Sequence, residues 1–403
     1  MQSDKTKLRK FPVTPPAGIG IAIAFYAFIA IGMAESGLGV LLPSIIQIYS
    51  LSPATVTYLF ISQVAGYVIA AFSSSIISNW LGLAPMLLVA AIALTTALAT
   101  YAMASAWFVM VVVGTLFGLS IGLIDAGINT YIVSDGREAK WIGLLHAFYG
   151  IGALLGPTIA TTLLVLRLEW RQIYLVFSAI VALLVIAVTG IVITGYQPMM
   201  KKTATKSNAW ADIRLALRMP IVILTGLFLL LNVGIEAALG NWAYTVQHLI
   251  RKFPAATAGY SVSAFWLGFT TGRLILGVLI NKLGANRLIN ISLATLVFGL
   301  ASWWLLPRQW LSLPLIGFAI AAMFPTTIWL MPQRVPSAIV PAAIGFVSSV
   351  ASLGAAIIPT TIGWIANRAG LESIPVLILV LAIALIVLHR CLAQYDVKDS
   401  TYN

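Results

Sequence analysis

The chain has 403 residues, of which 61% are hydrophobic and only 8% are charged, and its mean hydropathy is +1.02. This composition excludes a soluble globular protein, because too few polar side chains are present to cover a surface in water. The net charge of +12 is spread over many short polar segments, so it does not predict a nucleic-acid partner. The single Cys391 excludes an intrachain disulfide and a cysteine-rich metal site.

Twelve apolar segments of membrane-spanning length follow one another along the chain. A helix needs about 20 residues to cross a bilayer, and these runs are continuous, unlike the alternating strands of a barrel. The sequence therefore predicts an all-α integral membrane protein with twelve transmembrane helices, the first of which is retained because no small-residue cleavage site follows it. The spans are expected at about residues 17–46, 54–78, 83–104, 107–133, 141–166, 171–195, 220–248, 257–281, 285–306, 310–331, 337–366 and 372–393.

The longest polar interval separates two groups of six spans. We expect an N-terminal six-helix bundle over residues 1–196, a cytoplasmic linker over 197–219 and a C-terminal six-helix bundle over 220–403. Of the 23 lysines and arginines, 17 fall on the side of the tails and the linker, and six fall on the other side. This bias predicts that both termini are cytoplasmic and that the chain is a multi-pass protein of the plasma membrane, in bacteria the inner membrane.

The two groups of spans repeat each other. Landmarks from three pairs of spans recur at an offset of 201 or 202 residues. They are Asn79 with Asn281, Gly82 with Gly284, Gly152 with Gly354, Pro157 with Pro359, and Glu35 with Glu236. A parallel duplication of six spans is one way in which transporters place a solute site near the midplane, between two halves.

Twelve spans in two sets of six, joined by a long basic loop, resemble the major facilitator superfamily. The loop signature of that family is similar to a segment of the second half that follows Arg273, and it is eroded in the first half to Asn79 and Gly82. The second-half positions are Gly277, Asn281, Lys282, Gly284 and Arg287. Both acidic positions of the signature are Asn here, which removes the charge that latches the cytoplasmic gate in the family. Arg273 is expected to snorkel towards the surface or to bond helix ends, and a direct role in solute binding is the alternative.

The fourth span carries a small polar face. Gly118, Gly122, Asp125 and Asn129 share one side of a helix, so the glycines let a neighbouring backbone approach and the polar groups face protein or water. An acid followed four residues later by Asn in this span resembles the fucose/proton symporter-like branch. Adding 201 or 202 to Asp125 leads to Thr326 or Thr327, so the acid is not duplicated in the second half.

Three acids, Glu35, Asp125 and Glu236, lie well inside spans. An ionised carboxylate at membrane depth costs about 2.5–3.5 kcal/mol on insertion scales, so each acid is a functional candidate. Asp125 is predicted to carry the coupling proton, and the alternative is a buried acid that joins two helices. Glu35 is the expected second member, or else a structural hydrogen bond between the first and fifth spans. His146 is a candidate proton relay, although a lone His is often structural.

Several neutral side chains inside spans suit a polyhydroxylated solute. Glu236 and Asn232, one helical turn apart, are expected to hydrogen-bond the solute, unless they serve packing. The further candidates for the solute site are Asn129, Asn241, Tyr149, Gln63, Trp242 and Trp266. The two tryptophans could instead belong to the aromatic belts at the membrane surface.

Together these features predict a secondary transporter that works by alternating access and couples protons to the uptake of a sugar-like solute. The expected partners are the solute, protons or Na⁺, and the lipid bilayer, and the transporter is expected to be monomeric, with no cofactor and no enzyme activity. Residues 152–160 also resemble the antiporter motif of drug exporters, with Ala160 and Thr161 in place of its closing glycines. A proton-driven exporter is therefore one alternative, and a non-transporting sensor or a flippase is another.

Overall fold

The protein is described here by a computed structural model, which covers residues 18–134, 139–200, 214–306 and 311–400. The basic N-terminal tail, residues 135–138 and residues 201–213 of the expected linker lie outside the described residues. Eleven helical stretches in the described ranges are long and apolar enough to cross a membrane, and a bent helix pair makes a twelfth. The predicted all-α fold with twelve spans is confirmed.

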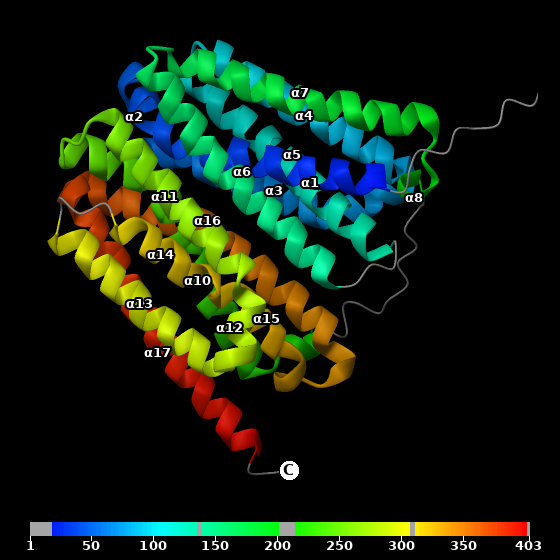
Figure 1. The fold of residues 1–403 in the computed structure, drawn as a ribbon, viewed down its shortest axis with the longest axis vertical. Helices are drawn as coiled ribbons and strands as arrows, with labels where there is room; N and C mark the ends of the chain where they lie inside the picture. Colours follow the sequence, from blue (N-terminus) through cyan, green and yellow to red (C-terminus); the bar gives the residue numbers. More distant parts are fainter. Residues whose placement is uncertain (1–17, 135–138, 201–213, 307–310, 401–403) are drawn as a thin grey trace, which may run out of the picture.

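The N-terminal half contains six spans, which Figure 1 draws from blue to green. They are formed by α1 (Gly18–Ser36) with α2 (Leu38–Ile48), α3 (Pro53–Leu81), α4 (Leu83–Met103), α5 (Trp107–Ser134), α6 (Ala139–Val165) and α7 (Trp170–Thr194). The short α8 (Gln197–Met200) follows. Ser52 is the N-cap of α3: its hydroxyl accepts a 3.0 Å hydrogen bond from the Thr55 amide, and Pro53 occupies the first helical position.

The C-terminal half repeats the arrangement. Its spans are α10 (Pro220–Thr245) with the π-helix η1 (Val246–Ile250), α11 (Ala255–Leu274) with α12 (Leu276–Leu283), α13 (Ala285–Leu305), α14 (Ser312–Ala321) with α15 (Met323–Arg334), α16 (Val340–Ala369) and α17 (Ile374–Ser400). The turns η2 (Ser337–Ile339) and η3 (Leu371–Ser373) precede α16 and α17. Between α11 and α12 the chain bends by 57°.

Two repeated glycines have a conformational reason. Gly82 joins α3 to α4 with a φ of 91°, and Gly284 joins α12 to α13 with a φ of 75°. A side chain is strained at such positive φ values, so glycine stands at the same turn of each half. The loop motif therefore sets the sharp connection between the second and third spans of each bundle.

The repeat is also visible in the packing of the helices, and it corrects one expectation. Gly66 of α3 packs against Thr115 and Leu119 of α5, whereas Gly268 of α11 packs against Pro314 and Phe318 of α14. The offset is 202 from α3 to α11 but 199 from α5 to α14, because the second half is three residues shorter between these helices. The structural equivalent of Asp125 is therefore Phe324, and the expected Thr326 or Thr327 is wrong.

Among the described residues, the close contacts between the two halves lie towards one end. There α3 packs against α16, α6 against α11, and α2 against α10. Thr158 and Thr162 of α6 make hydrogen bonds of 3.0 and 3.1 Å to Ser263 and Tyr260 of α11. We call this the closed end, and it lies at the left of Figure 1 near α2 and α11. At the opposite, open end, Gly143 of α6 has no atom within 4 Å of the place where a Cβ would stand.

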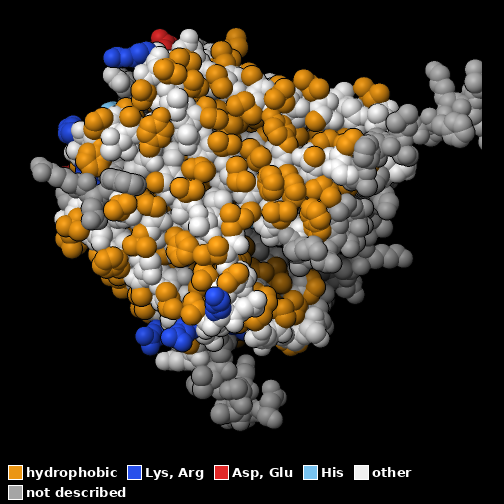
Figure 2. Space-filling model, in the orientation of Figure 1, with side chains coloured by type: hydrophobic (Ala, Val, Ile, Leu, Met, Phe, Trp, Pro, Cys, Tyr) orange, Lys and Arg blue, Asp and Glu red, His pale blue; other side chains and the backbone are white. Residues whose placement is uncertain are grey.

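The outer surface matches a membrane environment. Apolar side chains are spread over the whole described face in Figure 2, and lysines and arginines lie towards its edges. Large apolar side chains such as Ile186, Ile193 and Phe298 are more than 60% exposed on the described helices. In water this exposure would favour aggregation, so the helices are built to face lipid.

A polar cavity between the two halves

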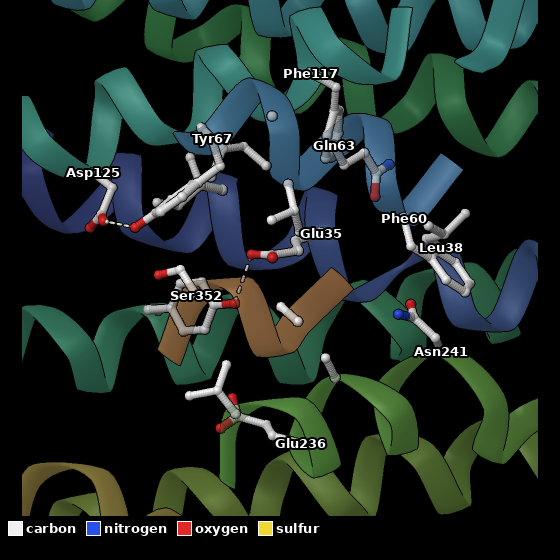
Figure 3. A pocket seen from close by; sticks show the side chains of 18 of the residues that line it. Glu35, Leu38, Phe60, Gln63, Tyr67, Phe117, Asp125, Glu236, Asn241 and Ser352 are labelled. Carbon is white, nitrogen blue, oxygen red and sulfur yellow. Dashed lines mark hydrogen bonds between the residues drawn. The ribbon is translucent and has the colours of Figure 1, made fainter. Parts of the chain in front are cut away.

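A cavity of about 270 Å³ lies between the two bundles. The N-terminal half contributes residues from α1, α2, α3, α5 and α6, and the C-terminal half contributes residues from α10, α11, α15 and α16. The sequence candidates in its lining are Glu35, Gln63, Asp125, His146, Tyr149, Glu236, Asn241 and Arg273. The structure therefore brings all three intramembrane acids into one site (Figure 3).

Asp125 has both carboxylate oxygens hydrogen-bonded within the protein. The Tyr67 hydroxyl donates to Oδ2 at 2.6 Å, and the Asn129 amide donates to Oδ1 at 2.9 Å. Figure 3 shows Asp125 and Tyr67 pointing towards one another from α5 and α3. This arrangement depends on Gly122, since a Cβ there would stand 2.6 Å from the Cβ of Ala70 on α3. The predicted small face thus lets α3 come close enough for Tyr67 to reach the acid.

Glu35 is bound by a second tyrosine. The Tyr149 hydroxyl of α6 donates to Glu35 Oε2 at 2.8 Å. Gly32 allows this approach, because a Cβ at that position would meet the Tyr149 carbonyl oxygen. The expected hydrogen bond between the first and fifth spans is therefore present, and it places the Glu35 carboxylate in the cavity rather than away from it.

The C-terminal half presents a different set of groups. Glu236 and Asn241 project from α10, Ser352 lines the cavity from α16, and Arg273 lines it from α11. The Arg273 guanidinium lies 4.2 Å from the centre of the Phe269 ring, and its Nε has no hydrogen-bond partner. Arg273 is close enough to Glu236 for the two charges to interact. Among the described lining residues it is the one lysine or arginine.

His146 occupies the N-terminal side of the cavity. Its ring packs edge-on against Phe28, with the ring centres 5.6 Å apart and the planes at 78°. The ring therefore lies in the same chamber as the acids, and Arg273 is near enough to influence it electrostatically.

Other sequence candidates lie elsewhere. Asn232 is fully buried, does not line the cavity, and has no partner for either amide atom. Trp242 is also buried, and it donates a 3.1 Å hydrogen bond to the Pro359 carbonyl at the closed end. Trp266 is 5% exposed and does not line the cavity, and Asn129 reaches it only through Asp125.

The loop motif is remote from the cavity, apart from Arg273. Asn79 and Gly82 end α3, and Asn281, Lys282 and Gly284 lie around the end of α12, followed by Arg287 on α13. None of these six residues belongs to the described lining, nor does Gly277.

Several lining residues had no place among the sequence candidates. Tyr67 is the most important, since it donates to Asp125. One signal could have found it, because Tyr67 stands four residues after Gln63 and therefore shares its helix face. The aromatic lining side chains Phe28, Phe60, Phe117 and Phe324, together with Ser352, carried no comparable signal. In the described part of the chain, no group of three or more His, Cys, Asp and Glu residues is placed to hold a metal ion.

Comparison with known proteins adds the family. The model of the Major Facilitator Superfamily matches residues 24–338. "Bypass of stop codon protein 6" of Saccharomyces cerevisiae is 25% identical, over 93% of this chain and 82% of its own length. "Glucose/mannose transporter GlcP" of Bacillus subtilis is 20% identical, over 75% of this chain and 77% of its own length. The crystal structure of nucleoside transporter NupG has a TM-score of 0.76 at 16% identity and covers 94% of this chain and 98% of that one.

Proposed function

The chain belongs to the Major Facilitator Superfamily, and from that premise we propose that it couples protons to the uptake of a polyhydroxylated solute of monosaccharide size. It is a multi-pass membrane transporter of small molecules. The observation that carries the proposal is the pair of carboxylates, Asp125 and Glu35, each hydrogen-bonded by a tyrosine inside the cavity that separates the halves.

Asp125 is proposed as the coupling site. A carboxylate removed from water is easier to protonate, and membrane burial makes its ionised form costly. The hydrogen bonds from Tyr67 and Asn129 offset part of that cost, so both protonation states can be populated. A proton carrier needs this balance, because it must load on one side of the membrane and unload on the other.

The lining supports a polyhydroxylated solute. Gln63 and Asn241 can both donate and accept hydrogen bonds, and Glu35 and Glu236 can accept them from hydroxyl groups. Phenyl rings in the same cavity offer flat apolar faces to C–H groups. The volume of about 270 Å³ is near the lower limit of about 300 Å³ for ligand pockets, which favours a monosaccharide over a larger sugar. The B. subtilis relative is named for glucose and mannose, and the NupG structure for nucleosides, which also carry a sugar.

Alternating access follows from the way the halves meet. We propose that bundles 1–196 and 220–403 rock about the cavity, with residues 197–219 as the cytoplasmic linker and one chain as the working unit. The excess of basic residues beside the tails and the linker supports cytoplasmic termini in the plasma membrane, in bacteria the inner membrane. This proposed orientation puts the open end, near the start of α6, on the cytoplasmic side, and we therefore infer an inward-open state.

The test uses purified protein in proteoliposomes and a panel of sugars and nucleosides. We expect a pH gradient to drive accumulation of one panel member by the wild type. Asp125→Asn should abolish this accumulation but keep solute counterflow, because exchange needs binding and alternation without net proton movement. Glu372→Gln is the matched control, since this carboxylate is exposed and remote from the cavity. Accumulation by Asp125→Asn at the wild-type level would refute the coupling site.

The same vesicles separate the alternatives. If a Na⁺ gradient alone drives accumulation of the solute, the coupling ion is sodium and not the proton. Solute movement against an imposed proton gradient would identify an exporter. The absence of counterflow for the whole panel would exclude transport of this class of solute and leave a sensor or a flippase.

A further inference from the structure

A second hollow lies on the seam between α3 and α16, at the closed end. It has a volume of about 610 Å³ and is separate from the central cavity. Its walls are formed by Ala54, Tyr58, Thr361, Trp364, Ile365, Asn367, Arg368 and Ala369. Four of them, Thr361, Trp364, Ile365 and Arg368, have the spacing of one helix face, so a continuous stripe of α16 forms one wall.

The chemistry of this groove changes along its length. Tyr58 is 51% exposed, Trp364 50% and Ile365 40%, so one part is aromatic and apolar. Asn367 and Arg368, both exposed, form the other part in the last turn of α16. Tyrosine and tryptophan are enriched where the hydrocarbon core meets the headgroups, and an arginine beyond them lies at headgroup level. The groove thus follows the two zones of a membrane lipid.

Arg368 also stands at a helix C-terminus, where a cation is favoured by the helix dipole. Glu372, the acid nearest to it in sequence, turns its carboxylate to the backbone at Gly370 instead. Arg368 is itself exposed, so its guanidinium can reach an anion at the surface.

We propose that the groove binds an anionic phospholipid, with the phosphate at Arg368 and Asn367 and an acyl chain along Tyr58, Trp364 and Ile365. Charge complementarity selects an anionic headgroup over a zwitterionic one, because the groove offers a cation and no carboxylate among its wall residues. The apolar part selects a lipid over a soluble anion. The site lies outside the solute path and does not depend on the identity of the solute.

The lipid would favour one state of the transporter. The groove exists because α3 and α16 are in close contact. A Cβ on Gly363 of α16 would stand 2.8 Å from the Pro53 carbonyl oxygen of α3. Opening of the closed end separates these helices and removes the groove. A ligand that binds only one of two states shifts the population towards that state, so the anionic lipid stabilises the closed end.

Binding is tested on the full-length protein in detergent, with phosphatidylglycerol and phosphatidylcholine as the probes. Native mass spectrometry should show phosphatidylglycerol retained in preference to phosphatidylcholine. The melting temperature of the protein should rise only when phosphatidylglycerol is added. Arg368→Gln should weaken retention about fivefold, the effect of one basic residue at an anionic lipid surface. Arg167→Gln, an exposed arginine at the same end but outside the groove, should leave retention unchanged.

The conformational effect is tested with a cysteine pair. Thr158→Cys with Ser263→Cys, in a Cys391→Ser background, joins α6 and α11 at the closed end, where the two hydroxyl groups are 3.0 Å apart. Cross-linking should be faster in vesicles with phosphatidylglycerol than in phosphatidylcholine alone, and Arg368→Gln should remove the difference. Equal retention of both lipids, full retention by Arg368→Gln, or an equal thermal shift with inorganic phosphate would each overturn the proposal.

Discussion

The seam between α6 and α11 predicts a contact that forms when the transporter changes state. These helices are antiparallel, and at the closed end Gly150 meets Thr270 while Thr161 meets Gly259. The residue numbers of each pair add to 420. Continued towards the open end, the same register pairs Gly143 with the residue numbered 277, which is also a glycine.

Gly143 and Gly277 are apart in this structure, and neither has an atom within 4 Å of an ideal Cβ. Gly277 lies on α12, which is bent by 57° from α11 and so does not continue along the line of that helix. The equivalent helix of the first half, α3, runs without a break. We therefore expect α11 and α12 to straighten when the open end closes, so that the two glycines pack as closely as the pairs at the closed end.

Gly143→Leu should affect one of the two states only. In this structure the new side chain meets open space. In the other state it would enter a contact as close as that of Gly150, where a Cβ would stand 2.6 Å from Thr270 Oγ1. Overpacking of a close contact costs about 1–3 kcal/mol, which corresponds to a shift of about 5- to 150-fold in a conformational equilibrium. Solute counterflow should fall by this factor, while the melting temperature in detergent stays at the wild-type value.

The matched control is Gly190→Leu on α7, since Gly190 is exposed and likewise has nothing within 4 Å. It should transport normally. In a Cys391→Ser background, Gly143→Cys with Gly277→Cys should form a disulfide only during turnover, because the present state keeps these positions apart. Wild-type counterflow by Gly143→Leu, together with no cross-link during turnover, would refute the register.

Three further substitutions test other contacts. Tyr67→Phe removes the donor to Asp125, and proton-driven accumulation should fall about tenfold or more, because a hydrogen bond to a charged group contributes about 1.5–3 kcal/mol; accumulation equal to wild type would contradict this role. Gly39→Val drives a side chain into the backbone of α10, so cross-linking at the closed end should slow, and an unchanged rate would count against that contact. Arg171→Gln removes a 2.7 Å hydrogen bond to the Ala104 carbonyl, so the melting temperature should fall while solute counterflow at low temperature stays constant; an unchanged melting temperature would contradict this role.

The spans were predictable from the sequence because length and hydropathy are local properties of each segment. The expected ranges differ from the observed helices by a few residues, and even the bent pair α11 and α12 covers the expected eighth span. It was harder to predict which residue of the second half is equivalent to a given residue of the first. A three-residue difference between the halves moved the equivalent of Asp125 to Phe324, and a constant offset cannot detect such a local deletion.

The site shows the same limit. Membrane burial singles out Glu35, Asp125 and Glu236 individually, since each costs free energy in lipid. Their partners depend on how the helices pack, and Tyr67 could not be assigned to Asp125 without the close approach of α3 and α5 at Gly122. Asn232 illustrates the reverse case. It shares a helix face with Glu236 by spacing, but only Glu236 reaches the cavity.

Arg273 tests whether the charges in the cavity act as a unit. The expectation of a snorkelling arginine places its charge at the membrane surface, whereas the structure places the side chain in the cavity lining near Glu236. Arg273→Gln would leave the Glu236 carboxylate without its neighbouring cation, and an uncompensated charge at membrane depth is costly. We therefore expect the single variants Arg273→Gln and Glu236→Gln each to lose most of their counterflow.

The double variant decides between the two roles of Arg273. If the charges compensate one another, removing both leaves a neutral pair, and Arg273→Gln with Glu236→Gln should transport better than the product of the single effects predicts. Charged neighbours typically couple by about 0.5–3 kcal/mol, or about 2- to 150-fold in rate. Effects that multiply without this rescue would mean that Arg273 contacts the solute or the helix ends independently of Glu236. Rescue would mean that the C-terminal half carries a balanced pair, leaving Asp125 and Glu35 of the N-terminal half to exchange protons.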